Sequence, residues 1–248
     1  MAEQTKGFCK YCGKSYARTG MLRHLSACKE RKAANDSETG EKKTGYFELL
    51  IYDKYCRDYW LIVEMPETAK LKDLDRFIRD IWVECCGHLS AFTVGEETYA
   101  STPCKDSFWG IRESSMNYKL KDIFSVGMLI KYEYDYGSTT ELVIKAQDYR
   151  TGIWKKEDVT ILSRNNPPLI LCSKCGKNPA QWINPEELYD GEEGFWCEEC
   201  LASMKDEDES EFDDYEEFYL PVCNSPRMGV CGYEGSDRYP DSFEPDKK

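Results

Sequence analysis

The sequence predicts an α+β protein: a central antiparallel or mixed sheet with helices on one face, flanked by a small ββα zinc finger and a zinc-ribbon-like module. Three observations predict this fold class. Strand-like runs and a helical period follow one another in the middle of the chain in the order ββαβ…ββ. One cysteine cluster with zinc-ligand spacing precedes this block, and a second cluster follows it.

The central block begins and ends with a pair of strand-like runs. "YFELLIY" and "DYWLIVEM" are separated by a short polar turn, which predicts an antiparallel hairpin. "MLIKYEYD" and "TELVIKAQ" alternate around Tyr136-Gly137-Ser138, which predicts a second hairpin. Between the hairpins, "LSAFTV" predicts a short strand and "KLKDIF" predicts one or two helical turns.

A helix should follow the first hairpin, with Thr68 available as its cap. Its apolar residues recur at spacings of three and four. They are Leu71, Leu74, Ile78, Ile81, Trp82 and Cys85.

Composition shifts divide the chain into four parts. Residues 1–32 form the finger, and the polar, aperiodic residues 33–45 predict a flexible linker. Residues 46–165 form the central α+β domain. Residues 166–248 hold the second cysteine module and an acidic tail.

The finger has the ligand spacing Cys9-x2-Cys12-x11-His24-x3-Cys28. Two cysteines two residues apart fit a tight knuckle, while a histidine and a cysteine four apart share one helix face. Tyr16 and Met21 occupy the apolar positions of a miniature core. Because so short a segment cannot build a stable core unaided, metal binding and folding should be one event. The motif resembles small Cys-Cys-His-Cys fingers and predicts a structural Zn²⁺ site.

The finger is also basic, with a net charge of +6 over residues 1–32. Such a face is suited to neutralising phosphates of DNA or RNA, or is simply a solvated helix surface. The candidate nucleic-acid-binding residues are Arg18, Arg23, Lys29, Arg31 and Lys32.

The second module has the spacing Cys172-x2-Cys175-x21-Cys197-x2-Cys200, which predicts a second structural Zn²⁺ site in a ribbon or knuckle pair. Four thiolates close the coordination sphere, which disfavours catalysis by this zinc. Residues 186–248 carry a net charge of −16, and "DEDESEFDDYEE" (206–217) is the most acidic stretch. The run is typical of a solvated tail, with an acidic strip that docks on the basic finger as the alternative.

The other cysteines and the second histidine have no complete motif. Seven residues separate Cys223 from Cys231, and we interpret both as buried thiols of a turn-rich segment; the alternative is that they form a third metal site or substitute into the second. Cys56, Cys85, Cys86 and Cys104 are interpreted as packing residues. His88, just beyond the predicted helix, should cap carbonyls or join Asp135 and a tyrosine hydroxyl in a buried network.

The central block resembles a known family, named after the third open reading frame of a plant-tumour (Ri) plasmid. The resemblance spans about residues 46–147 and rests on "YWLIVEM", "LKDLDRFIRDIW", "HLSAF", "LKDIF" and "YEYDYG". It implies an α+β fold and an association with mobile elements, but no established activity. One departure is that Ser138 and Thr139 follow the glycine, where relatives usually have an acid and a tryptophan.

The sequence thus favours a non-enzymatic zinc-binding protein that recognises nucleic acid through its basic finger. The alternative is a protein–protein adaptor that uses the zinc modules as docking surfaces. The chain starts without a signal-peptide pattern and has no membrane-length apolar run, so we expect a soluble, cytoplasmic protein. Cysteine hooks, that is Cys-x-x-Cys pairs, in a chain without a signal-peptide pattern favour zinc binding over disulfide bonds.

Overall fold

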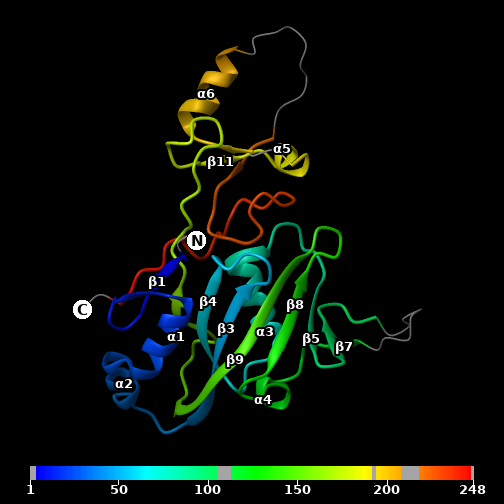
Figure 1. The fold of residues 1–248 in the computed structure, drawn as a ribbon. Helices are drawn as coiled ribbons and strands as arrows, with labels where there is room; N and C mark the ends of the chain where they lie inside the picture. The colour runs from blue at the N-terminus through cyan, green and yellow to red at the C-terminus, as the bar shows by residue number, and fades with distance from the viewer. Residues whose placement is uncertain (1–3, 105–112, 192–193, 208–217, 247–248) are drawn as a thin grey trace.

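A computed structural model describes the chain over residues 4–104, 113–191, 194–207 and 218–246, and its main feature is a mixed eight-stranded sheet (Figure 1). All neighbouring strands pair antiparallel except β6 and β7. The sheet order is β10-β4-β3-β9-β8-β5-β6-β7. The strands are β3 (Lys43–Asp53), β4 (Trp60–Pro66), β5 (Ser90–Val94), β6 (Glu97–Ala100), β7 (Glu113–Ser115), β8 (Leu129–Tyr134), β9 (Thr140–Ile153) and β10 (Thr160–Arg164). The predicted α+β fold class is confirmed.

Both predicted hairpins form, β3 with β4 and β8 with β9. The β3–β4 hairpin is buried on both of its faces. Leu49 and Ile51 point into the main core, whereas Leu50 joins a second cluster with the finger. Burial on two faces explains why these strands are continuous apolar runs rather than alternating ones.

Helices cover the main-core face of the sheet. Helix α3 (Leu71–Ile78) continues into a π-helical turn, η1 (Arg79–Val83), and the short helix α4 (Leu120–Ile123) lies on the same core. The helix predicted from the apolar spacing is therefore present, but it ends before Cys85. Its N-cap is Lys70 rather than Thr68, and the carboxylate of Asp73 accepts a hydrogen bond from the Lys70 amide at 2.9 Å.

The finger consists of the hairpin β1 (Lys6–Phe8) and β2 (Ser15–Ala17), followed by α1 (Arg18–Ala27) and α2 (Lys29–Asp36). The finger packs against the sheet and is not joined to it by a flexible linker alone. The Lys10 amide donates to the Leu162 carbonyl of β10 at 2.9 Å, and Gly7 approaches Arg164 so closely that a Cβ would clash. The segment predicted as a flexible linker, 33–45, contains the end of α2 and the start of β3.

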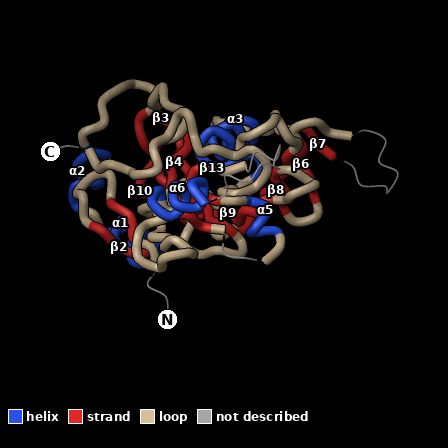
Figure 2. Tube along the Cα trace, turned by 90° about the horizontal axis from the view of Figure 1, so that it is seen from above, coloured by secondary structure: helices blue, strands red, loops and turns tan. Residues whose placement is uncertain are grey.

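The four-cysteine module has its own small sheet, in the order β12-β11-β13. Its elements are β11 (Trp182–Ile183), α5 (Pro185–Tyr189), β12 (Phe195–Trp196), α6 (Glu198–Glu207) and β13 (Leu220–Pro221). It projects beyond one end of the large sheet (Figure 1), and from above α5 and α6 lie in front of the strands (Figure 2). Most of the acidic run lies outside the described residues, since 208–217 are not part of them.

The C-terminal segment, residues 223–246, leaves the module and returns to the central domain. Ser225 donates to the Trp82 carbonyl at 2.5 Å, and Arg227 pairs with Asp135 at 2.7 Å. Asp246 reaches Lys10 of the finger, also at 2.7 Å. The region predicted as one unit over 166–248 therefore contains a module and a strap that packs against the rest of the protein.

Candidate metal centres

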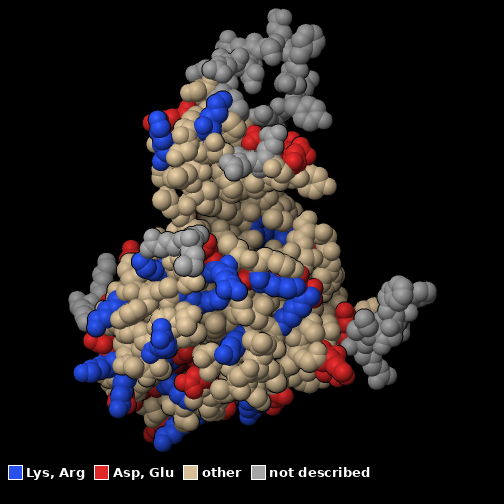
Figure 3. Space-filling view, in the orientation of Figure 1, with Lys and Arg blue, Asp and Glu red and all other residues tan. Residues whose placement is uncertain are grey.

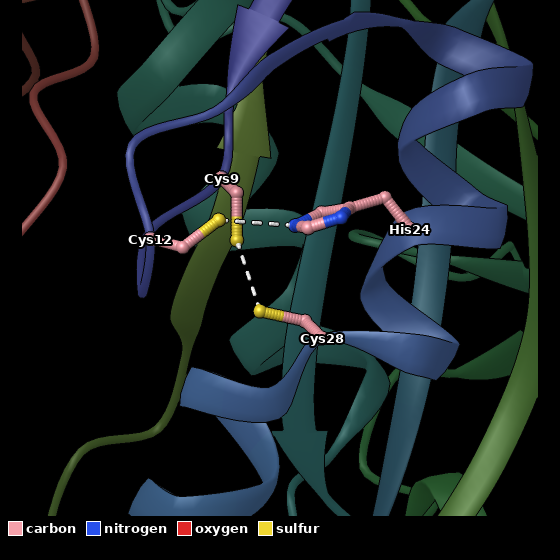
Figure 4. A group of neighbouring side chains, drawn as sticks. All are labelled: Cys9, Cys12, His24 and Cys28. Atoms are coloured by element: carbon pink, nitrogen blue, oxygen red, sulfur yellow. Dashed lines mark hydrogen bonds between the residues drawn. The ribbon is translucent and has the colours of Figure 1, made fainter.

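The finger brings its four predicted ligands together (Figure 4). Cys9 and Cys12 lie in the β1–β2 turn, His24 lies on α1, and Cys28 lies between α1 and α2. The Sγ atoms of Cys9 and Cys28 are 3.9 Å apart, and Cys12 Sγ is 3.2 Å from His24 Nε2. A tetrahedral zinc ion with bonds of about 2.0–2.3 Å has ligand–ligand edges of roughly 3.5–3.8 Å. These four side chains can therefore bind one metal ion.

Local sequence explains how this geometry forms. Gly13 has a φ of 70° and its amide donates to the Cys9 carbonyl at 2.9 Å, which closes the knuckle around the first two cysteines. The Tyr16 ring stacks on His24 with centroids 4.7 Å apart, and Met21 is fully buried. The predicted miniature core therefore exists, but it is continuous with residues of the sheet.

The protonation of the finger ligands depends on their burial. Burial raises the pKa of the Cys9 thiol to about 12, so a metal ion has to displace a proton to bind there. Burial lowers the pKa of His24, which keeps its imidazole neutral and able to donate an electron pair.

The four-cysteine module also brings its predicted ligands together. Cys172, Cys175, Cys197 and Cys200 have their sulfur atoms within 4.8 Å of one another, and Cys175 and Cys197 are 4.0 Å apart. Burial opposes ionisation of Cys172, but amides including those of Cys175 and Cys197 outweigh it and lower the pKa of its thiol to about 6. Amides likewise lower the pKa of Cys175, whereas the hydrogen bond with Cys197 raises the pKa of Cys200 to about 12, so the first hook favours thiolate and Cys200 has to lose a proton to bind a metal ion.

A third group of ligand atoms lies within the same distance: those of Cys85, Cys86, His88 and Cys231. Interpreting Cys85 and Cys86 as packing residues missed this group. His88 does lie near Asp135, at 3.7 Å, and against the Tyr134 ring, but its Nε2 also faces Cys231 at 3.6 Å. The pattern Cys-Cys-x-His was visible in the sequence, whereas its fourth member is 143 residues away.

The remaining cysteines divide by exposure. Cys223 is buried, as expected for a packing thiol. Four other cysteines are exposed, so the interpretation as packed or buried thiols is wrong for them: Cys56, Cys86, Cys104 and Cys231.

The five candidate nucleic-acid-binding residues do not form one exposed face. Arg23, Lys29 and Lys32 are exposed. Arg18 lies 4.5 Å over the Tyr52 ring and is half-buried. Arg31 is only 8% exposed, which removes it from the predicted basic surface.

Arg31 instead belongs to a buried ion-pair ladder between finger and sheet. Its guanidinium contacts Glu48 at 2.6 Å and Glu64 at 3.1 Å. Arg150 also binds Glu64, at 2.6 Å, and extends the ladder to Glu38 at 3.0 Å. The ladder lines a polar groove of about 370 Å³ between α2 and the sheet. The ion pairs of the ladder therefore hold the finger on the sheet in addition to the apolar contacts between them.

No protein-family model matches the chain, and no curated protein matches it significantly. A crystal structure of a protein of unknown function from Methanosarcina mazei Go1 is similar, with a TM-score of 0.43 and 17% sequence identity, over 49% of this chain and 70% of that one. Among the described residues, no helix is long and apolar enough to cross a membrane.

Proposed function

We propose that the protein is a non-enzymatic zinc protein that binds nucleic acid through the outer surface of its finger. The observation that carries the proposal is the docking of the finger. Its apolar side packs against the sheet, while Arg23, Lys29 and Lys32 remain exposed. Lysine and arginine side chains predominate on the face formed by sheet and finger (Figure 3). Such a face neutralises phosphates without reading bases.

The ligand sets support a structural role for the metal. The finger and the four-cysteine module each offer four protein ligands, which saturate a tetrahedral zinc ion and leave no position for water or substrate. Zinc is the expected metal because a set of four thiolate or imidazole ligands is typical of zinc sites. The resemblance of the central domain to the Ri-plasmid family remains part of this proposal, and it adds no activity.

The test compares two triple variants with the same change in charge. Arg23→Glu, Lys29→Glu and Lys32→Glu alter the finger surface, while Lys72→Glu, Lys119→Glu and Lys121→Glu alter exposed positions on and around α3 and α4. Binding of fluorescent duplex and single-stranded DNA and RNA is titrated at several salt concentrations. The finger variant should lose at least about tenfold in affinity and show a shallower salt dependence. Equal affinities for the two triple variants would refute the proposal.

A protein–protein adaptor is the second candidate, and exposed apolar side chains at the module favour it. Tyr189 is 92% exposed and Leu169 is 74% exposed. Exposed tyrosine and leucine side chains of this size are available as anchors for a protein partner. Affinity purification with and without nuclease separates the candidates, because nuclease would abolish only a nucleic-acid-mediated association.

A further inference from the structure

The third ligand group, Cys85, Cys86, His88 and Cys231, is called the clamp site below. It joins the loop between η1 and β5 to the C-terminal segment. Cys231 Sγ lies 3.6 Å from Cys86 Sγ and 3.6 Å from His88 Nε2, and all four ligand atoms are within 4.8 Å of one another. The edges of a zinc tetrahedron with three sulfurs and one nitrogen are about 3.6 Å for S–N and about 3.8 Å for S–S. The clamp site fits this geometry as closely as the two motif sites do.

A carboxylate lies behind the histidine of the clamp site. Nδ1 of His88 faces Asp135 Oδ1 at 3.7 Å, which leaves Nε2 directed at the cysteines. Asp135 is itself fixed by Arg227 at 2.7 Å and by the Gly137 amide at 3.0 Å. A carboxylate behind the ring of a ligating histidine is the usual outer-shell arrangement in zinc sites.

Two non-glycine residues with positive φ also lie at the clamp site. Of the described residues, the non-glycine ones with positive φ are Asp135 at 63° and Cys231 at 56°. One supplies a thiol to the clamp site and the other faces its histidine. Left-handed conformations cost free energy for residues with a side chain, and they persist where the surroundings require them. A cysteine in this conformation, turned towards three other zinc-type ligands, indicates a positioned ligand.

We propose that the clamp site binds a third zinc ion, which fastens the C-terminal segment and the base of the four-cysteine module to the central domain. The inference goes beyond nucleic-acid binding and does not depend on it. Three thiols and one imidazole are the donor set of structural zinc. Because Cys86 and Cys231 are exposed, whereas each motif site has two buried cysteines, the clamp site should release its metal first to a chelator.

Thiol labelling of the zinc-saturated full chain tests the proposal without any substitution. Cys86 and Cys231 are exposed, as are Cys56 and Cys104, so burial cannot protect one pair and not the other. Mass spectrometry after brief iodoacetamide treatment should find Cys56 and Cys104 alkylated. The alkylation rates of Cys86 and Cys231 should be at least about tenfold lower. Mild chelation should abolish the difference. Equal labelling rates in the zinc-saturated protein would overturn the proposal.

Metal counting provides the second test. The double variant Cys86→Ser/Cys231→Ser should contain two zinc ions per chain by elemental analysis, while the wild type and the control Cys56→Ser/Cys104→Ser should contain three. Two ions in the wild type, or three in the clamp-site variant, would contradict a third site. Hydrogen exchange tests the clamp itself: exchange should rise within 223–246 in the clamp-site variant and stay unchanged in β3 and β4. Unchanged exchange in 223–246 would refute the fastening role.

Discussion

The finger and the four-cysteine module offer the same number of metal ligands but relate differently to the rest of the protein. Met21 and Leu25 of the finger share a core cluster with Leu50, Trp60 and Ile62 of the sheet. The buried apolar residues of the module, such as Ile183 and Leu220, belong to neither of the two core clusters formed by the described residues. The finger is therefore an integral part of the central domain, whereas the module has its own small sheet and its own candidate metal site.

This difference shows what ligand spacing does and does not encode. Spacing predicts that four side chains can meet around a metal ion, and at both sites the four ligand atoms lie within 4.8 Å of one another. It does not predict what the folded module then covers. The sequence of the sheet indicates the covered surface instead. The runs "LLI" and "WLIV" in β3 and β4 are apolar at every position, so both faces of these strands need to be covered.

The largest expected effect comes from removing one ligand from each site. Cys12→Ser and Cys175→Ser are matched, since each is the half-buried second cysteine of its hook. Loss of the finger metal should lower the free energy of unfolding of the central domain by on the order of 5 kcal/mol, because the finger then uncovers Leu50, Trp60 and Ile62. Cys175→Ser should leave it unchanged. Hydrogen exchange of β4 distinguishes the two variants, and equal protection of β4 in both would show that the finger is as separable as the module.

The ion-pair ladder provides the next largest effect. Arg31→Ala leaves Glu48 buried without its ion-pair partner and leaves Glu64 paired with Arg150 alone, and breaking a buried pair in this way costs about 3–5 kcal/mol. Arg23→Ala, on the exposed side of the same finger, should change stability by less than about 0.5 kcal/mol. Urea unfolding of the zinc-loaded proteins measures both. If the two substitutions had equal effects, charge would contribute nothing specific to docking.

Much of the central domain could be predicted from the sequence. Both hairpins, the strand at 90–94 and the helix from Leu71 follow from periodicity and turn residues, since each is a local pattern. Strands β6, β7 and β10 were not predicted. They are short, and β10 is defined by its pairing with β4 about a hundred residues earlier, which no local pattern encodes.

The metal sites also differ in whether their ligands are close together or far apart in the sequence. The finger and module sites have ligands in paired local hooks, so their residues could be predicted. The clamp site needs Cys231 to meet a loop that lies 143 residues before it, and only the return path of the C-terminal segment brings them together. Arg31 was misassigned for a related reason: it lies among exposed basic residues in sequence, but the docking of α2 turns it towards two carboxylates.

The contacts that Glu38 makes next to the finger should depend on pH. Burial opposes ionisation of Glu38, but hydrogen bonds from Arg150, Lys155 and the Ile153 amide outweigh it and lower its pKa to about 2. Because this value lies below the ordinary 4.5, the ionised Glu38 stabilises the fold fully above about pH 4.5, and the contribution is lost as the pH falls towards 2. Glu38→Gln should therefore cost about 1–2 kcal/mol at neutral pH and less at about pH 3.5. Urea unfolding at both pH values checks this, and a difference between wild type and variant that is independent of pH would contradict it.

The smallest effect should be local to the module. The Asn184 side chain caps α5 by accepting hydrogen bonds from the amides of Glu186 at 3.0 Å and Glu187 at 3.4 Å. Asn184→Ala should destabilise the module by about 1 kcal/mol, the usual cost of losing a cap, while Asn184→Asp, which keeps the acceptor, should cost less. Because the module shares no core cluster with the sheet, hydrogen exchange should rise in β11 and α5 and remain unchanged in β3 and β4. Faster exchange in β3 or β4 would mean that the module and the sheet unfold as one unit, and the contrast between module and finger would then be one of degree.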